Sequence, residues 1–220
     1  MLSRLAGQLV PAVGRLTLTT DGGAGLPPAG IIAANHTSLA DPAIVLAALL
    51  RLGARPVVMA TAGLWSVPLL GRALAREGHI PVRRGDPRAA RSVDLAEEAL
   101  ERGRHILIYA EGGLPRRTDP AEAEPGAFRR GLAGLAHRTG APVIPVGQAG
   151  ARRVTSGSAV KQLAGLATAP VRRPRLHVHV GPPLCLDGEG AAATEQARLA
   201  VTAAWRTAVA RLGEPAGPAV

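Results

Sequence analysis

Cysteine and aromatic residues are almost absent from this sequence of 220 residues. Cys185 is the single cysteine, so no disulfide can form within the chain, and we expect a reducing compartment. We interpret Cys185 itself as a small buried hydrophobe. One Phe, one Tyr and two Trp leave Leu, Val, Ile and Ala to fill the core. The same scarcity argues against a nucleic-acid partner, because bases need aromatic side chains on which to stack.

Lysine is also nearly missing, since Lys161 is the only one. Arginine supplies the other basic residues, and 26 basic against 16 acidic residues give a formal net charge of +10. A GC-rich genome is the simplest cause of this bias, but guanidinium groups bind phosphates and carboxylates well whatever their origin. The charge points to an anionic partner, either a membrane surface, a phosphorylated metabolite or a nucleic acid.

Long apolar runs are lacking, and no stretch reaches the roughly 18 residues expected of a membrane-spanning helix. The N-terminal segment is interrupted by Gln8 and Pro11 and has no convincing cleavage site, so we expect no signal peptide. Any membrane contact is therefore expected to be peripheral. Residues 63–71, GLWSVPLLG, are the segment we expect to face the membrane, with Trp65 at the interface; a core helix is the alternative.

Strands and helices are predicted to alternate along the chain, which indicates a single α/β domain with a mostly parallel or mixed sheet flanked by helices. The predicted strands are residues 31–35, 55–60, 79–84, 105–110, 142–147 and 175–181, and the predicted helices are residues 2–13, 42–52, 86–103, 127–140 and 191–212. Pro81 makes 79–84 an edge strand. We divide the chain into an amphipathic, turn-rich lead-in (1–29), the domain (30–212) and a loose tail (213–220).

The decapeptide AANHTSLADP, residues 33–42, carries the most chemistry in the sequence. His36 directly follows a predicted strand, where sites are commonly built in α/β proteins. Asp41 is five residues further on and can orient the His36 ring so that its other nitrogen acts as a base. Asp41 before Pro42 is also typical of a helix N-cap. One carboxylate can serve both purposes.

Three later segments are each weak signals when taken alone. GHIPVRR (78–84) ends in two arginines, YAEGG (109–113) places a carboxylate and two glycines directly after a strand, and APVIPVG (141–147) is a strand bracketed by prolines. Backbone N–H groups freed after a strand can hold an anion. The usual explanation for each is a solvated pair of arginines or an ordinary turn.

Taken in order, these segments resemble the glycerolipid acyltransferases typified by 1-acylglycerol-3-phosphate acyltransferase. That family has four ordered blocks. N-H-x4-D is met by Asn35, His36 and Asp41, and a Gly…Arg strand is met by Gly78 and Arg84; E-G-T-R is matched in part by Glu111, Gly112 and Gly113, and V/I-P-V is met by residues 143–146. The resemblance covers roughly residues 30–187 and implies a glycerol-phosphate-acyltransferase-like fold.

The resemblance implies a reaction as well as a fold. His36, oriented by Asp41, would remove the proton from an acceptor hydroxyl, which then attacks the thioester of acyl-CoA or acyl carrier protein without forming an acyl-enzyme. Backbone N–H groups would stabilise the oxyanion. Arg84, with Arg83, would bind the acceptor phosphate, and Glu111 and Gly112 would shape the acceptor site. By family default the acceptor is 1-acylglycerol-3-phosphate and the product is phosphatidate, an intermediate of phospholipid biosynthesis.

The third block departs from the family pattern. Gly113-Leu114-Pro115 stands where the family has Thr-Arg-Ser, so its phosphate-binding arginine is missing at that position. Arg116 and Arg117 lie just beyond and are candidates to replace it. The alternatives to a lysophosphatidate acceptor are therefore an acceptor without a phosphate, or a catalytically idle basic lipid-binding protein.

Other chemistry finds little support in the sequence. There is no G-x-S-x-G, nucleotide-binding loop or zinc spacing, and we expect no metal and no cofactor beyond the acyl donor. His177 and His179 share one face of a predicted strand and are interpreted as half-exposed rather than as metal ligands. We expect a protein of the cytoplasm that binds peripherally to the anionic inner face of the cell membrane.

Overall fold

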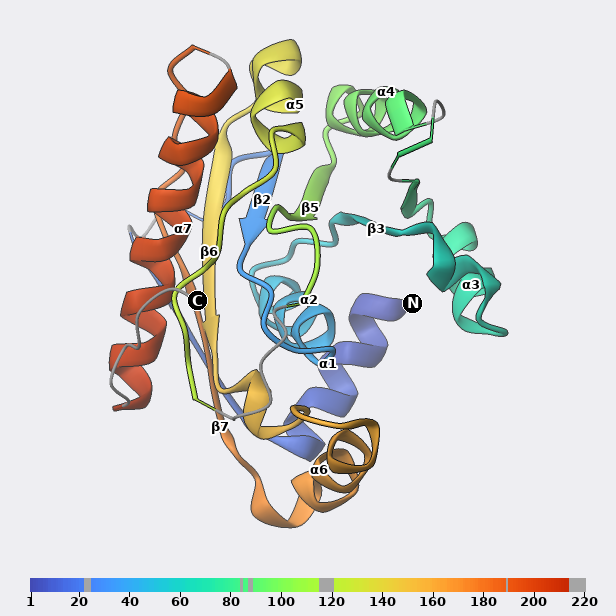
Figure 1. Ribbon diagram of the computed structural model, residues 1–220, viewed down its shortest axis with the longest axis vertical. Coiled ribbons are helices and arrows are strands. Elements are labelled where there is room, and N and C mark those ends of the chain that lie inside the picture. Colours follow the sequence, from blue (N-terminus) through green and yellow to red (C-terminus); the bar gives the residue numbers. More distant parts are fainter. Residues whose placement is uncertain (22–24, 84, 87–88, 115–120, 189, 214–220) are drawn as a thin grey trace.

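The computed structural model describes residues 1–220 except 22–24, 84, 87–88, 115–120, 189 and 214–220 (Figure 1). Its helices are α1 (Leu2–Val13), α2 (Asp41–Arg51), α3 (Leu70–Arg76), α4 (Ala89–Glu101), α5 (Gly131–Thr139), α6 (Ala159–Arg172) and α7 (Gly190–Leu212). Its strands are β1 (Arg15–Thr20), β2 (Gly30–Ala34), β3 (Val57–Thr61), β4 (Ile80–Val82), β5 (His105–Tyr109), β6 (Val143–Ala149) and β7 (Arg175–Val180). Two short 3₁₀ turns are η1 (Ala62–Ser66) and η2 (Ala151–Arg153).

The seven strands form one mixed sheet in the order β1-β7-β6-β2-β5-β3-β4. Strands β2 to β6 are mutually parallel, β7 pairs antiparallel with β6, and β1 pairs parallel with β7. The predicted α/β domain with a mixed sheet is therefore confirmed, and β4 is the edge strand that Pro81 indicated. Among the described residues, no helix is both long enough and apolar enough to cross a bilayer.

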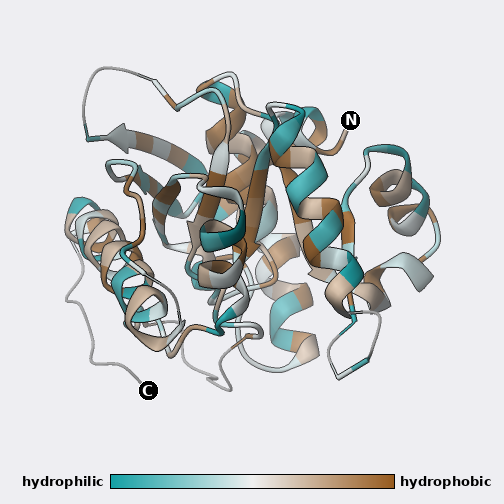
Figure 2. Ribbon diagram, turned by 90° about the horizontal axis from the view of Figure 1, so that it is seen from above, coloured by the Kyte–Doolittle hydropathy of each residue, from teal (hydrophilic) through white to brown (hydrophobic). Residues whose placement is uncertain are grey.

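Helices cover both faces of the sheet, as central parallel strands require. All five residues of β2 are buried, and they alternate between two apolar clusters. One cluster joins the sheet to α1 and α2, and the other joins it to α4, α5 and α7. In Figure 2 the brown, hydrophobic colour of the central strands lies between these two layers of helices. α7 packs so closely on β6 that a Cβ at Gly147 would lie 2.1 Å from the backbone of Ala204.

Among the helices and strands, β1, α3 and α6 were not predicted from the sequence. β1 lies in the lead-in, and α6 lies in a stretch whose arginines and serines suggested no element. The alternation in RLTLTT is a strand signal, and the spacing of Val160, Leu163 and Ala167 is a helix signal. β1 and α6 lie at one side of the molecule, and only some of their apolar residues are buried in the core.

Three local expectations are corrected by the structure. α2 begins at Asp41, with Ala40 as its N-cap residue, so Asp41 is the first helical residue and not the cap. η1 contributes no buried residue, which rules out a core helix at 62–66. Cys185 is exposed, so it is not the buried hydrophobe that we expected. His177 and His179 are each only 3% exposed, so they are buried and not half-exposed.

The register of the central strands places three chain segments at one edge of the sheet. Ala34 at the end of β2 is opposite Tyr109 of β5 and Val146 of β6. Because parallel strands end at the same edge, residues 35–41, 110–113 and 147–155 come together there. The first two of these segments contain the motif residues expected to carry the chemistry.

Candidate active site

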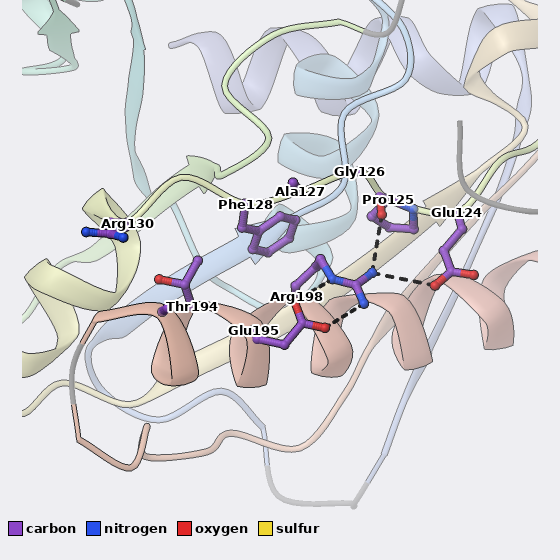
Figure 3. Close-up of a pocket in the computed structure, with 10 residues that line it drawn as sticks. Glu124, Pro125, Gly126, Ala127, Phe128, Arg130, Thr194, Glu195 and Arg198 are labelled. Atoms are coloured by element: carbon purple, nitrogen blue, oxygen red, sulfur yellow. Dashed lines mark hydrogen bonds and ion pairs between the residues drawn. The ribbon is translucent and has the colours of Figure 1, made fainter.

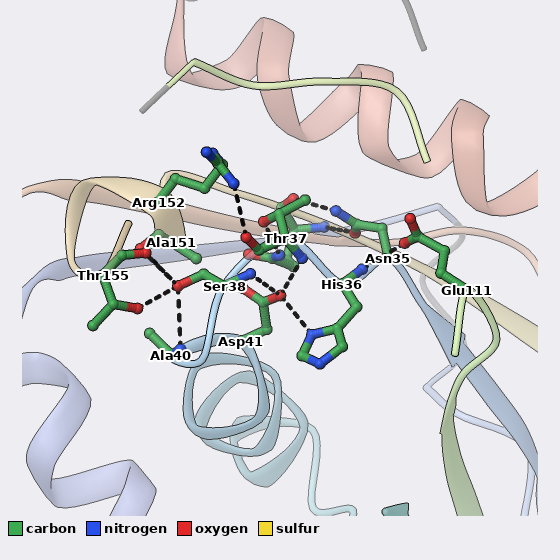
Figure 4. Close-up of polar contacts among 11 residues, drawn as sticks. Asn35, His36, Thr37, Ser38, Ala40, Asp41, Glu111, Ala151, Arg152 and Thr155 are labelled. Atoms are coloured by element: carbon green, nitrogen blue, oxygen red, sulfur yellow. Dashed lines mark hydrogen bonds and ion pairs between the residues drawn. The ribbon is translucent and has the colours of Figure 1, made fainter. Parts of the chain in front are cut away.

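His36 and Asp41 form a hydrogen-bonded pair at the carboxyl end of β2 (Figure 4). His36 Nδ1 lies 2.9 Å from Asp41 Oδ2. The same carboxylate oxygen accepts hydrogen bonds from the backbone N–H groups of Thr37 at 2.5 Å and Ser38 at 2.8 Å. The turn into α2 thus folds back on the Asp41 side chain, which explains why the pair is separated by five residues in the sequence.

The environment of the pair leaves one ring nitrogen of His36 available. Asp41 has no exposed surface, whereas the His36 side chain is 17% exposed. The His36 ring packs against the ring of Tyr109, with centroids 4.4 Å apart. Within the described residues Nε2 has no hydrogen-bond partner. Because Asp41 accepts from Nδ1–H, this arrangement favours the tautomer whose Nε2 lone pair is available as a base.

Burial dominates the electrostatics beside His36. Burial raises the pKa of Asp41, and the hydrogen bonds from His36, Ser38 and Thr37 act in the opposite direction. Burial, with the neighbouring Asp41 carboxylate, raises the pKa of Tyr109 well above its usual value, so this phenol stays neutral. The Asp41 carboxylate is therefore held in a poorly solvated place, where hydrogen bonds replace its contact with water.

Strand β6 holds the segment that carries His36. The Asn35 amide donates to the Gln148 carbonyl at 3.1 Å and accepts from the Gln148 N–H at 2.8 Å. The Gln148 side chain donates in turn to the Thr37 hydroxyl. Asn35, which we expected to bind substrate, has no exposed surface and uses both ends of its amide on β6. Its role in the structure is to fix the start of the loop.

The other half of the loop is held by η2 and the residues after it. The Ser38 hydroxyl lies 2.8 Å from the carbonyl of Thr155 and contacts the Thr155 hydroxyl. Arg152, a buried arginine, donates from Nη1 to the Thr37 carbonyl at 3.0 Å. These contacts between segments more than 100 residues apart carry no sequence signal, and sequence reasoning missed Gln148, Arg152 and Thr155.

Glu111 connects His36 to the loop that precedes α5. Its Oε1 accepts from the His36 backbone N–H at 2.7 Å, and its Oε2 accepts from the Gly126 N–H at 3.0 Å. Burial raises the pKa of Glu111, and these two N–H groups oppose the shift. The carboxylate thus lies beside the predicted base, as the resemblance implied, but it binds backbone groups.

Gly112 has a backbone conformation that favours glycine and lies against the side chain of Arg129. Its φ is +77°, and a Cβ at this position would lie 2.3 Å from Nε of Arg129. The exposed Arg129 side chain therefore lies directly against the Glu-Gly block. Arg129 was not among the predicted site residues. Its place beside Gly112 provides a cation in a block whose expected arginine is missing.

The remaining predicted residues are distributed differently. Gly78, with φ +70°, precedes β4 and lies at the amino edge of the sheet, away from His36, so it serves a turn. Arg83 is exposed just after β4, three strands from β2, or about 14 Å at the usual strand spacing. Gly113 is exposed after Gly112. Arg84, Arg116 and Arg117 lie outside the described residues.

A cavity of about 500 Å³ lies between the loop at 124–128 and α7 (Figure 3). Phe128 and Ala127 form part of its apolar lining. Arg198 crosses it and binds Glu195 at 2.7 Å and Glu124 at 3.5 Å. His36 does not line this cavity. It is therefore separate from the general-base pair, although Gly126 belongs to both surroundings.

Together, a His–Asp pair at the carboxyl edge of an α/β sheet and a His36 nitrogen left open form an arrangement that is compatible with general-base chemistry. Comparison with known proteins identifies its family. Residues 22–148 match the family model described as Acyltransferase, which covers more than half of the chain. The chain therefore belongs to the acyltransferase family.

Individual relatives are more distant. The chain is 29% identical over 119 residues to a chloroplastic 1-acyl-sn-glycerol-3-phosphate acyltransferase of Brassica napus, covering 53% of this chain and 31% of that protein. A chloroplastic 1-acyl-sn-glycerol-3-phosphate acyltransferase of Arabidopsis thaliana is also 29% identical over 119 residues, which cover 30% of that protein. The chain thus spans about a third of these curated relatives.

A solved structure supports the fold over nearly the whole chain. The 1-acyl-sn-glycerophosphate acyltransferase PlsC from Thermotoga maritima superposes with a TM-score of 0.68 at 16% identity, covering 98% of this chain and 80% of that one. At this identity the likeness concerns the fold.

Proposed function

We propose that this protein transfers a fatty acyl group from acyl-CoA or acyl carrier protein to the free hydroxyl of a lysophospholipid, with 1-acylglycerol-3-phosphate as the first acceptor to test. The observation that carries the proposal is the 2.9 Å contact between His36 Nδ1 and the buried Asp41 carboxylate. Membership of the acyltransferase family and the two plant relatives named for this reaction add support.

In the proposed reaction His36 Nε2 removes the proton from the acceptor hydroxyl. The hydroxyl oxygen attacks the thioester carbonyl carbon, and the tetrahedral intermediate collapses with cleavage of the C–S bond. The proton held on His36 passes to the leaving thiolate, so the products are an ester and a free thiol. Asp41 stabilises the imidazolium that exists between the two proton transfers. No residue of the chain becomes acylated.

We propose that Arg129 contributes to binding the acceptor phosphate, together with Arg83 and Arg84. Arg129 lies against Gly112, and Glu111 on the other side of that glycine contacts the His36 backbone. An exposed guanidinium beside the proposed acceptor site can hold a phosphate through two parallel hydrogen bonds. Arg130, the next residue along the chain, serves as the matched control, because it lines the cavity beside α7.

This role predicts that Arg129→Ala raises KM for lysophosphatidate by about tenfold and leaves kcat nearly unchanged, as loss of one charged hydrogen-bonding partner would. Arg130→Ala is expected to leave KM within about twofold. Steady-state kinetics on both variants measures the difference. Equal KM changes for lysophosphatidate and an uncharged analogue would contradict the phosphate role.

The proposed activity is tested by incubating the purified protein with acyl-CoA and a panel of lysolipids, alongside His36→Ala. We expect ester formation with at least one lysophospholipid and a decrease of about 10²–10⁴-fold in the variant. Transfer at the wild-type rate in His36→Ala would exclude His36 as the base. Transfer only to acceptors without a phosphate would favour the alternative acceptor, which the missing arginine of the third block motivates.

A catalytically idle lipid-binding protein is the second candidate. It is motivated by the net charge of +10 and would bind vesicles while transferring no acyl group to any acceptor. The intact His36–Asp41 pair argues against it. For the acyltransferase we also propose a peripheral location at the anionic cytoplasmic face of the cell membrane, where a lysophospholipid acceptor would be available.

A further inference from the structure

Helix α1 buries mainly small residues and leaves several large apolar residues exposed. Ser3, Ala6 and Val10 are its buried residues, and a Cβ at Gly7 would lie 2.8 Å from Leu50 of α2. The exposed apolar side chains are Met1 at 70%, Leu5 at 43% and Leu9 at 54%. A helix that only completes a core places its large apolar residues against that core. In α1, Val10 does so, whereas Leu5, Leu9 and the N-cap residue Met1 do not.

Helix α6 repeats the arrangement. Ala169 is its one buried residue, and a Cβ at Gly165 would lie 2.5 Å from the Val154 carbonyl oxygen. Its larger apolar side chains are exposed, namely Val160 at 78%, Leu163 at 72%, Leu166 at 47% and Val171 at 88%. Its small residues allow the helix to pack closely on the protein. Its large apolar side chains remain in solvent, so folding does not gain the free energy that their burial would provide.

The two helices are neighbours at one side of the molecule (Figure 1). Ala169 belongs to the same apolar cluster as Ala6 and Val10, and the Arg173 side chain donates to the Pro11 carbonyl at 3.1 Å. We call the exposed apolar residues of both helices the α1–α6 surface: Met1, Leu5, Leu9, Val160, Leu163, Leu166 and Val171. Among the described residues, it holds seven of the twelve exposed large hydrophobic side chains.

The charged side chains on the segments that form this surface are basic, and an acidic residue, Glu77, binds the N-terminal ammonium group of Met1 at 3.1 Å. Residues 1–20 and 150–175, which include both helices, contain eight basic residues and no acidic residue. Arg4 on α1 and Lys161 on α6 are exposed beside the apolar side chains. Apolar side chains that can enter the acyl boundary, flanked by cations at the headgroup level, fit the surface of an anionic bilayer.

We propose that the α1–α6 surface docks the protein on an anionic bilayer; the inference rests on the proposed function, because it takes the acceptor to be a membrane lipid. The α6 part of the surface lies at the active-site end of the sheet: Ser38 contacts Thr155, four residues before α6. Leu39, between Ser38 and α2, is 65% exposed. Docking through α1 and α6 therefore brings the His36 loop toward the membrane surface.

The surface differs from the segment that the sequence suggested. Residues 63–71 contribute only Val67 and Leu69 to the exposed large hydrophobic side chains of the described chain. A second copy of the chain is a poorer occupant than a bilayer. A two-fold interface places the same patch of each copy against the other, and here that would bring basic residues together without acidic partners.

The test is co-sedimentation with vesicles of phosphatidylcholine mixed with phosphatidylglycerol, using the full chain and the double variant Leu9→Glu/Leu163→Glu. We expect the variant to lose at least about tenfold in partitioning, because it removes apolar area and adds negative charge. Leu199→Glu is the matched control, since Leu199 is 53% exposed on α7, which covers the other face of the sheet. The control is expected to bind as the wild type does.

A second assay separates docking from catalysis. With short-chain acyl-CoA and short-chain lysophosphatidate below their micelle concentrations, the double variant should transfer acyl groups at the wild-type rate. Equal vesicle binding by wild type and double variant would overturn the docking proposal, as would a wild-type dimer that the variant converts to a monomer without vesicle binding. Surface-dependent vesicle binding without any acyl transfer would support docking and contradict the proposed function.

Discussion

Two histidine sites, a partly exposed one at His36 and a buried one at His177, differ in what surrounds their ring nitrogens. His36 offers Nδ1 to a fully buried carboxylate and leaves Nε2 open among the described residues. His177, on β7, lies with Nδ1 2.6 Å from the Thr17 hydroxyl and Nε2 2.9 Å from the Thr19 hydroxyl. Only the first arrangement leaves a nitrogen for a substrate.

The difference shows what makes a histidine a base. The Thr17 hydroxyl donates to the Leu176 carbonyl, so it accepts from His177 Nδ1–H. The Thr19 hydroxyl is the partner of Nε2, so both nitrogens of the neutral ring are hydrogen-bonded. His177 therefore helps to join β1 to β7. His179 extends the chain of contacts to the exposed carboxylate of Asp21 at 3.1 Å. Hydrogen bonds to both nitrogens leave a ring without a site for a substrate proton, whereas one oriented bond and one open nitrogen leave such a site available.

The largest expected effect comes from replacing Asp41, one of the two carboxylates that pair with histidines at these sites. Asp41→Asn should lower kcat by about 10²–10⁴-fold, because a neutral amide no longer stabilises the His36 imidazolium and can fix the wrong tautomer. Asp21→Asn is the matched control, since the Asp21 side chain is 60% exposed and contacts His179. It should leave kcat within about twofold. Similar losses in both variants would remove the distinction between the two sites.

The pH dependence of stability tests the second site. Burial, followed by the neighbouring charges of His179, Arg211 and Arg175, lowers the pKa of His177 to about 4. In the unfolded chain His177 takes up a proton near pH 6.5, whereas in the native state it does so only near pH 4. The contribution of the neutral His177 to stability is therefore complete above pH 6.5 and is lost as the pH falls toward 4. The loss from this residue is about 3 kcal/mol over that range.

His177→Asn removes this titration and keeps a side chain that can bond to Thr17. Its free energy of unfolding should decrease less than that of the wild type between pH 6.5 and pH 4. Urea unfolding at several pH values measures both slopes. Parallel curves for the two proteins would contradict a neutral, buried His177.

The smallest effect is expected from Thr19→Val. The Thr19 hydroxyl lies 2.9 Å both from His177 Nε2 and from His179 Nδ1, so its removal leaves two ring nitrogens without this partner. The free energy of unfolding should fall by about 1–3 kcal/mol, while the rate of acyl transfer stays unchanged. A lower kcat in a stably folded Thr19→Val protein would show that the two sites are coupled.

Much of the fold was predictable because its central elements are locally consistent. The strands at β2, β5 and β6 are short apolar runs, and α4 and α7 lie within predicted helices. β1 and α6 were missed because their burial depends on partners far along the chain. Arg15 of β1, for example, pairs with Arg175 of β7, and α6 turns its large residues to solvent.

The candidate site divides in the same way. His36 and Asp41 are close in sequence, so a turn into a helix was enough to predict their pairing. Asn35 belonged to the same motif, but its bonds to Gln148 are made across 113 positions and change its role from binding to support. Arg129 reaches Gly112 through the return of a long loop, which no local pattern specifies.

The sequence by itself determined the alternation of strands and helices and the order of the motif blocks, because periodicity and spacing are local properties. It also supplied the pair His36 and Asp41 through a single turn. The tertiary structure alone decided which histidine keeps an open nitrogen, which arginine lies beside Gly112 and which helices turn their apolar residues outward. These depend on strand register and on packing between distant segments, since hydrogen-bond satisfaction and burial are settled only when the whole chain is folded.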